Sequence, residues 1–361
     1  MVEGPRVGGQ AGRTKYGSEG IGMTQAYMSE AGRGADPDGT GRRTGRLSGW
    51  WRREGMWRRG IVLAALAVVL GLLMVLHADV PNSVGNLGSL LETFLPWVGL
   101  GVPVLLVAAL LRRSATALVA LVLPAVVWAN LFAGQLTDKS GNAGNLTVAT
   151  HNVDAANTDP AGTARQVASS GADVIALEEL TAEALPEYRA ALAKQYPYRT
   201  VQGTVGVWSK YPLSDARPVD IKMGWTRALR ATVTAPDGQR VAVYAAHLPS
   251  VRVKVKAGFT ANQRDRSAAA LGEAIAQERL SKVVLLGDLN GTMNDRSLAP
   301  VTAQMRSAQG AAGDGFGFSW PAAFPMARID QIMVKGVDPA SAWTLRSTGS
   351  DHLPLAASFK I

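Results

Sequence analysis

The stretch GSDHLPLAASF (residues 349–359) places an acid and a histidine directly before an apolar run that is typical of a β-strand. Its histidine, His352, is one of only four in the 361 residues. Charged groups beside a buried strand are costly to assemble unless they bond to one another or share a metal ion. Asp351 and His352 therefore predict a polar site at the edge of a sheet.

The same pattern recurs at five more strand-like runs, each of which meets a carboxylate, amide or imidazole. They are LTVATHN, which reaches Asn152, DVIALEE, which reaches Glu179, VAVYAAH, which reaches His247, VVLLGDLN, which contains Asp288 and Asn290, and RIDQIMV, which contains Asp330. Two further runs, VGVWSKY and ALRATVTA, also read as strands, and helical patterns lie at 161–171, 181–196 and 262–280. Residues 146–361 therefore predict one soluble domain of mixed α and β structure.

Taken in order, the polar groups read N, LxE, HL, GDxN, RID and SDH, and in this order the chain resembles the endonuclease/exonuclease/phosphatase superfamily. That group includes DNase I-like nucleases, apurinic endonucleases, inositol polyphosphate phosphatases and bacterial sphingomyelinases. The resemblance covers about residues 145–361. It implies an α/β (α+β) fold in the form of a four-layer αββα sandwich, and hydrolysis of a phosphoester with Mg²⁺, or Mn²⁺ as the alternative ion.

The resemblance implies that Asn152, Glu179 and Asp351 lie at the metal site. A hard cation such as Mg²⁺ prefers oxygen ligands of this kind. The family motif reads L-Q-E, whereas this chain has Glu178 in the place of the Gln. Glu178 therefore either adds negative charge beside the metal or faces the other side of its strand. His151 precedes Asn152 and is expected to point to the opposite face.

The resemblance also implies a catalytic set. His352 activates water or steadies the scissile phosphate, and Asp330 holds the far side of its ring. Asp288 and Asn290 contact the attacking water and the phosphoryl oxygens, and His247 donates to a phosphate oxygen. The chemistry agrees, because an imidazole with a pKa near 6.5 can take or give a proton at neutral pH.

Basic residues near the predicted site are candidates for binding the substrate. Arg227 and Arg230 lie in GWTRALRATV, and the run VRVKVK alternates Arg252 and Lys254 so that basic side chains point one way. This run reads either as a phosphate track or as an edge strand that charge protects from aggregation. The aromatic loop at 315–325 is expected to fill the gap between the sheets.

Composition limits the classes of function. The net charge of +9 favours acidic partners such as phosphates, anionic lipid or nucleic acid. The absence of cysteine excludes disulfides, thiolate zinc sites and cysteine nucleophiles.

The front of the chain has a different character. Residues 1–56 are rich in Gly, Arg, Ser and Thr and are expected to form a disordered, basic tail. Residues 57–136 contain three apolar runs, at about 61–77, 94–111 and 115–136, which predict three transmembrane helices. The rivals are a signal peptide, for which a basic lead of about 60 residues is too long, and buried core helices. A polar linker, 137–145, precedes the domain.

The basic residues also predict an orientation. Arginines precede the first run and follow the second, whereas the loop between these runs carries Asp79 and Glu92 and no basic residue. Because basic loops stay inside, the N-terminus is expected to be cytoplasmic and the domain after three crossings to be extracellular.

These observations predict a multi-pass plasma-membrane enzyme that hydrolyses a phosphodiester or phosphomonoester by metal-assisted in-line attack of water. Its substrate is a nucleic acid, a phospholipid headgroup or a small phosphate ester, and no obligate protein partner is evident. The alternative is a catalytically inactive phospho-ligand-binding or scaffold protein of the same fold. A transporter subunit is disfavoured, because the apolar runs lack intramembrane charges.

Overall fold

The computed structural model describes residues 55–361 apart from 84, 143, 252, 255–257 and 260. The predicted tail of residues 1–56 lies almost wholly outside the described residues.

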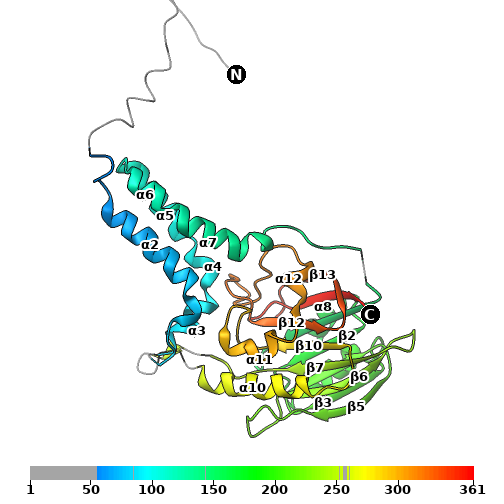
Figure 1. Ribbon diagram of the computed structural model, residues 1–361. Helices are drawn as coiled ribbons and strands as arrows, with labels where there is room; N and C mark the ends of the chain where they lie inside the picture. The colour runs from blue at the N-terminus through cyan, green and yellow to red at the C-terminus, as the bar shows by residue number, and fades with distance from the viewer. Residues whose placement is uncertain (1–54, 84, 143, 252, 255–257, 260) are drawn as a thin grey trace, which may run out of the picture. The chain divides into compact units, whose positions relative to one another are not determined.

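Two mixed six-stranded sheets form the centre of the C-terminal domain (Figure 1). The first has the order β13 (Asp338–Thr344), β14 (Leu355–Lys360), β1 (Leu146–Asn152), β2 (Val174–Glu178), β4 (Val205–Ser209), β3 (Tyr198–Gln202). The second has the order β11 (Arg306–Ser307), β12 (Asp330–Lys335), β10 (Val283–Asp288), β7 (Arg240–Ala246), β6 (Ala228–Thr234), β5 (Leu213–Pro218). The pairs β1–β2 and β7–β10 are parallel, and β8 (Val253–Lys254) pairs separately with β9 (Gly258–Phe259).

The strands are apolar on both faces because both faces are covered. In β10, Val284 and Leu286 pack in the layer between the two sheets, together with residues of β1 and β2. Val283 and Leu285 point the other way and pack under α10 (Asn262–Ala276). A strand buried on both sides needs a continuous apolar run rather than an alternating one, which explains the sequence VVLL.

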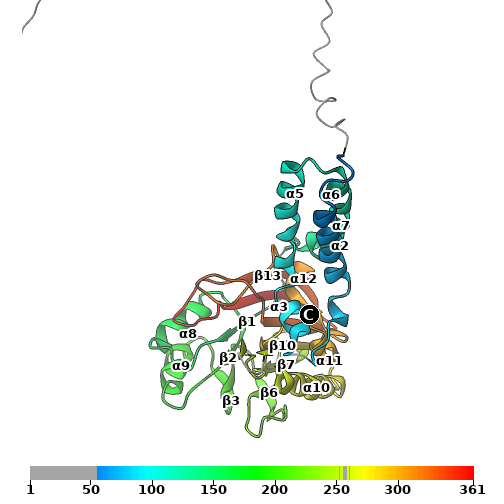
Figure 2. The ribbon, with the colours of Figure 1, turned by 90° about the vertical axis from the view of Figure 1, so that its left-hand side faces the viewer.

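Helices cover the outer face of each sheet. α8 (Pro160–Ala168) and α9 (Leu185–Leu192) pack on the first sheet, and α10 and α11 (Ala299–Thr302) pack on the second. A short helix, α12 (Ala308–Ala312), follows. Figure 2 shows α8 and α9 on one side of the sheets and α10 on the other. The order helix, sheet, sheet, helix confirms the predicted α/β sandwich.

The predicted elements differ from the observed ones mainly at the sheet edges. All eight predicted strands are present, but β3, β5 and β13, which lie at sheet edges, and the two-residue β11 were not predicted. The side chains of β5 are mostly exposed, so this strand has no apolar run to find. The second predicted helix begins later than expected, at Leu185, with Pro186 in its first turn, where proline is tolerated.

In the described part of the chain, six α-helices and two turns of 3-10 helix precede the domain. The α-helices are α2 (Ile61–Val75), α3 (Leu87–Thr93), α4 (Leu95–Val98), α5 (Gly101–Leu111), α6 (Ala115–Ala120) and α7 (Val122–Phe132), and the 3-10 turns are η1 (His77–Asp79) and η2 (Ala133–Gln135). We call residues 61–136 the helical segment.

The three predicted transmembrane helices are not shown by this segment. Of the described residues, only Ala115–Gln135 forms a helix that is long and apolar enough to cross a membrane, with 21 residues and a mean hydropathy of 2.1. Leu87–Thr93 and Leu95–Leu111 would qualify only as a pair, and they are bent by 79° at their break. Ile61–Val75 has 15 residues, which is below the roughly 17–25 that a span requires.

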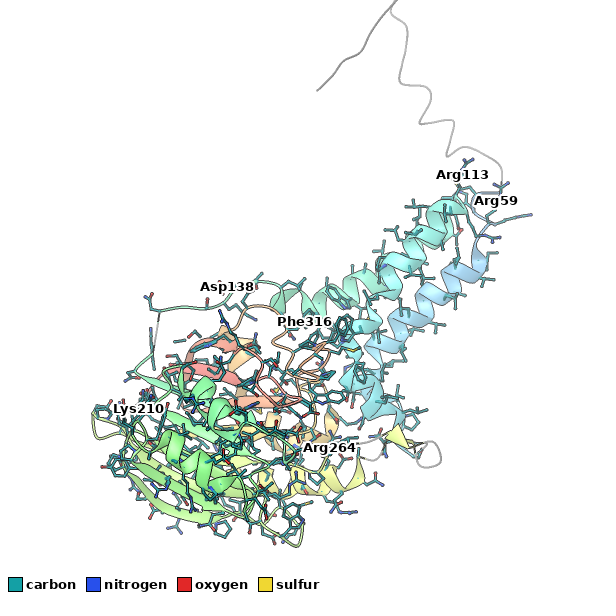
Figure 3. All side chains as sticks on the ribbon, turned by 180° about the vertical axis from the view of Figure 1, so that it is seen from behind. Arg59, Arg113, Asp138, Lys210, Arg264 and Phe316 are labelled. Atoms are coloured by element: carbon teal, nitrogen blue, oxygen red, sulfur yellow. The ribbon has the colours of Figure 1, made fainter. Side chains whose placement is uncertain are left out.

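The helical segment packs against the domain through aromatic and polar contacts. The indole nitrogen of Trp97 donates to the backbone oxygen of Met326 at 2.7 Å, and its ring stacks on Phe318 with the centroids 5.7 Å apart. Phe316, labelled in Figure 3, lies between Phe318 and Phe132. The expectation for the loop at 315–325 is therefore wrong, because Phe316 and Phe318 pack against the helical segment and not between the sheets.

Candidate active site

The polar groups that follow or precede the central strands meet at one edge of the two sheets. Asn152 ends β1, Glu179 follows β2, and Asp288 ends β10. Asp330 begins β12, and antiparallel pairing places it directly opposite Asp288. His352 precedes β14, which is antiparallel to β1, so it returns to the same edge.

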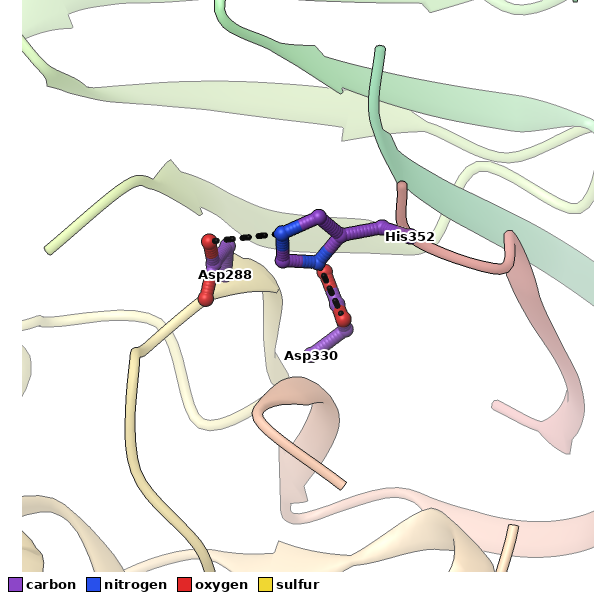
Figure 4. Close-up of side chains that lie close together, drawn as sticks. All are labelled: Asp288, Asp330 and His352. Atoms are coloured by element: carbon purple, nitrogen blue, oxygen red, sulfur yellow. Dashed lines mark hydrogen bonds and ion pairs between the residues drawn. The ribbon is translucent and has the colours of Figure 1, made fainter. Parts of the chain in front are cut away.

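His352 and Asp330 form a buried pair, which Figure 4 shows together with Asp288. Nδ1 of His352 lies 2.8 Å from Oδ2 of Asp330, which also accepts a hydrogen bond of 2.6 Å from the Ser319 hydroxyl. Nε2 lies 3.8 Å from Asp288 and 3.8 Å from Asp351. Burial acts to lower the pKa of His352, but Asp330 and the other two carboxylates outweigh it and raise the pKa to about 10.

Asp288 is the centre of a network of hydrogen bonds. Its carboxylate accepts from the backbone N–H of Asn290 at 2.8 Å and from the Asn290 side chain at 3.0 Å. The Asn152 amide donates to Asp288 at 3.1 Å and to Glu179 at 3.2 Å. Burial, and then the neighbouring Asp330, raise the pKa of Asp288 to about 7.

Glu179 and His247 form the other side of the network. Nε2 of His247 lies 3.5 Å from Glu179 and 3.6 Å from Asp288, and its ring contacts the guanidinium of Arg227. Burial, with Arg227 and His352 nearby, holds the pKa of His247 well below its usual value. Glu179 has a backbone φ of 63°, which is uncommon for a residue other than glycine. Such left-handed positions are frequent at functional sites.

A pocket of about 490 Å³ lies at this edge of the sheets. Six of the predicted residues contribute to it, namely Asn152, Glu179, Asp288, Asn290, Asp351 and His352. A neighbouring hollow of about 660 Å³ contains Arg227 and His247 and shares Glu179 and Ser250 with the pocket. Arg227 thus lies beside the pocket, where its positive charge would attract a phosphate bound in the pocket.

The donors of the pocket fit a hard divalent cation. The amide nitrogen of Asn152 donates to the carboxylates of both Glu179 and Asp288, which brings the two acids close together, and carboxylate oxygens are ligands that Mg²⁺ prefers. Asp288, Asp330 and His352 also offer atoms within 4.8 Å of one another. Nδ1 of His352 is engaged by Asp330, however, so the ring and Asp330 are better suited to handling a proton than to holding an ion.

One of the four predicted substrate-binding residues, Arg230, is not brought to the pocket. Arg230 lies three residues along β6 from Arg227 and faces α10, where its guanidinium pairs with Glu278 at 2.9 Å. The structure thus does not bring Arg230 to the catalytic pocket, because its position on the outer face of the second sheet directs it away from the strand ends. Arg252 and the side chain of Lys254 lie outside the described residues.

Glu178 and His151 are buried under the site and do not line the pocket. Glu178 accepts a hydrogen bond of 2.9 Å from the Thr150 hydroxyl, and burial raises its pKa well above the usual value. Burial therefore disfavours a negative charge on Glu178. His151 bonds to Thr348 at 2.8 Å, as expected of a residue on the opposite face.

Other parts of the site could not be predicted from strand endings. Ser319 and Ser350 orient Asp330 and the backbone around Asn152 through hydrogen bonds of 2.6 and 2.7 Å. Thr93, Phe94 and Trp320 form part of the wall of the pocket. Ser350 is adjacent to Asp351 and could have been suspected, but nothing in the sequence links residues 93 and 94 to a site more than 50 positions further along the chain.

Comparison with solved structures finds the same fold. The structure of D. rerio TDP2 complexed with single strand DNA product has 19% identity and a TM-score of 0.51, over 60% of this chain and 99% of that one. The mannosyl-6-phosphatase of Bacteroides thetaiotaomicron has 17% identity and a TM-score of 0.50, over 60% of this chain and 100% of that one. At these identities the likeness shows the fold. No curated protein matches the sequence.

A family model gives the assignment. The model described as the endonuclease/exonuclease/phosphatase family matches residues 149–352, which is more than half of the chain and includes every residue of the pocket that comes from the domain. The chain therefore belongs to the endonuclease/exonuclease/phosphatase family.

Proposed function

We propose that this protein hydrolyses a phosphoester with the help of a divalent metal ion, Mg²⁺ or Mn²⁺. The observation that supports this most strongly is the meeting of Glu179, Asn152 and Asp288 with the His352–Asp330 pair in one pocket. Membership of the family and the likeness in fold to a mannosyl-6-phosphatase and to TDP2 bound to a DNA product agree with a phosphoester substrate.

The residues of the site would have different roles in the reaction. Glu179, Asn152 and Asp351 would hold the cation, which when bound neutralises the phosphate and polarises its P–O bonds. The proton on Nδ1 of His352 points to Asp330, and three carboxylates surround the ring, so Nε2 would carry a proton and donate it to a phosphoryl oxygen. Asp288, oriented by Asn290, would accept the proton of the attacking water. His247, held neutral, would donate to a second phosphate oxygen.

Metal dependence is the test of this proposal. The full chain, purified in detergent, is expected to cleave at least one member of a panel of DNA, phospholipids, a simple diester and a simple monoester, and EDTA should abolish the turnover. Glu179→Gln should raise the Mg²⁺ concentration for half-maximal rate at least about tenfold, since an altered metal site typically costs 10–100-fold in affinity. Glu183→Gln, an exposed residue four positions away, serves as the matched control.

Two outcomes would count against it. A folded protein with no EDTA-sensitive turnover on any substrate, but with calorimetric Mg²⁺ binding that Glu179→Gln removes, would favour the inactive phospho-ligand-binding alternative. The absence of both turnover and metal binding would reject the site itself.

We further propose that the helical segment anchors the chain in the plasma membrane with the domain outside the cell. The apolar helix at Ala115–Gln135 supports this, and so does the place of Arg59 and Arg113, which lie at the same end of the helices, away from the domain (Figure 3). Basic residues favour the cytoplasmic side.

Because the chain has no cysteine, its orientation can be read from single introduced cysteines. A membrane-impermeant maleimide is expected to label Asp138→Cys in intact cells, and Ser48→Cys only after permeabilisation. Labelling of both variants, or of neither, in intact cells would contradict the proposed orientation.

A further inference from the structure

The helical segment and the loop at 315–325 enclose an apolar groove of about 460 Å³. Its walls include Trp97, Leu100, Val102, Trp128, Phe316 and Phe318, and no charged side chain lines it. Both indole N–H groups are already used, because Trp97 donates to Met326 and Trp128 donates to the backbone oxygen of Pro96 at 2.9 Å. The groove therefore offers apolar surface and no free indole donor, which suits a hydrocarbon ligand.

The groove lies next to the catalytic pocket. A small hollow of about 180 Å³ shares Pro96, Phe316 and Phe318 with the groove, and it shares Thr93 with the catalytic pocket. Two short stretches, 93–97 and 316–320, thus contribute to all three cavities. A molecule with its phosphate at His352 could extend its other end past these stretches into the groove.

A basic side chain, that of Arg328, lies at the hollow between the groove and the pocket. Arg328 lines it and donates hydrogen bonds to the Ser307 hydroxyl at 2.6 Å and to Gln331 at 3.1 Å. A positive charge between a polar pocket and an apolar groove suits the boundary between an anionic headgroup and a hydrocarbon chain.

The size and surroundings of the groove favour a hydrocarbon chain over a protein partner. One turn of an α-helix with its side chains occupies about 500 Å³, so a groove of 460 Å³ holds at most a single turn. Beyond it, α5 stays apolar and exposed to its end, with Val104 67% and Leu111 79% exposed. A flexible hydrocarbon chain can follow such a surface beyond the groove.

We propose that the substrate is an amphipathic phosphoester, whose phosphate is cleaved in the catalytic pocket while its hydrocarbon chain lies in the groove. This inference rests on the proposed phosphoesterase function. It assigns the helical segment a role in substrate selection in addition to anchoring. Each methylene that is moved from water into the groove strengthens binding about fourfold.

The test compares chain lengths on one headgroup. Butyl and hexadecyl esters, as phosphomonoesters and as 4-nitrophenyl diesters, are offered to the full chain in micelles at a fixed detergent ratio. We expect a KM at least about tenfold lower for the hexadecyl ester, from burial of only two methylenes. Leu100→Glu should remove this advantage and leave the butyl ester unaffected, whereas Val104→Glu, on the same helix outside the groove, should keep it.

A second readout does not depend on turnover. Hexadecyl phosphate with a brominated chain should quench the tryptophan fluorescence of EDTA-treated protein, because Trp97 and Trp128 line the groove, and Leu100→Glu should weaken the quenching. If Leu100→Glu fails to fold, Leu100→Gln replaces it.

The experimental result that would overturn the groove as a chain site differs from the result that would reject the proposed function. Equal kcat/KM for butyl and hexadecyl esters, or an equal loss in Leu100→Glu and Val104→Glu, would overturn the groove as a chain site while leaving the enzyme intact. No turnover of any ester or panel member would reject the proposed function.

Discussion

Replacing His352 with alanine is expected to lower kcat by about 10²–10⁴-fold, the range typical of losing a positioned proton donor. The ring is held by Asp330 at 2.8 Å and points Nε2 into the pocket, so no other imidazole can take its place. His247 is the other histidine at the site, and its low pKa keeps it neutral. The measurement is steady-state kinetics on the best substrate of the panel at saturating Mg²⁺.

The variant Asp330→Asn tests how Asp330 acts on His352, by positioning its ring or by favouring its protonated form. It keeps a group beside Nδ1 but removes the charge that favours the imidazolium, so we expect a smaller loss of kcat and a shift of the basic limb of the pH–rate profile toward lower pH. Circular dichroism of each variant checks that the fold is intact. A His352→Ala enzyme that keeps wild-type kcat would remove His352 from the mechanism.

Glu278→Gln is expected to destabilise the domain by about 3 kcal/mol at pH 7, because breaking the buried ion pair leaves the Arg230 charge with only the exposed carboxylate of Asp215, 3.8 Å away. Arg230 and Glu278 have side chains only 4% and 3% exposed, and two contacts of 2.9 and 3.1 Å join them. The Tyr244 hydroxyl donates to the same carboxylate at 2.9 Å. The amide cannot carry the negative charge that Arg230 requires.

The loss should depend on pH in a defined direction. Burial acts to raise the pKa of Glu278, but the hydrogen bonds from Arg230 and its other partners outweigh it and lower the pKa from 4.5 to about 2. A lowered folded-state pKa contributes stability that is present above pH 4.5 and is lost as the pH falls toward 2. The difference between wild type and Glu278→Gln should therefore shrink between pH 5 and pH 3.

Urea denaturation at several pH values measures this difference. Glu273→Gln, at an exposed acid on α10 five positions before Glu278, is the control and should stay within about 0.5 kcal/mol of wild type throughout. A Glu278→Gln deficit that does not change with pH would show that the pair is not the source of the stability.

The positions of Arg227 and Arg230 show what a strand pattern in the sequence can and cannot predict. Arg227 and Arg230 are three positions apart in one strand-like run, and both carry the positive charge that binding a phosphate requires. The structure places Arg227 against His247 near the pocket and Arg230 against Glu278 on the outer face. Residues on a strand alternate between faces and progress along it, so being close in sequence to the site is not enough to reach it.

The helical segment shows a different limit. Its apolar composition was read correctly as helical, but at the start of its second run the chain bends by 79°, between Leu87–Thr93 and Leu95–Leu111. That bend brings Thr93 and Phe94 to the catalytic pocket and Trp97 to Met326, 229 positions away. No local pattern encodes contacts of this separation.

The order of apolar runs and the polar residues beside them was enough to predict a mixed α and β domain with a polar site around Asp288 and His352, and to recognise the family resemblance that implies the sandwich. This is so because strands covered on both sides need continuous apolar residues, and their shared ends bring scattered polar groups to one edge. The pairing of Arg230, the burial of Glu178, the edge strands and the groove beside the pocket emerged only from the folded chain. They depend on burial and on contacts between distant segments, which no short window of residues contains.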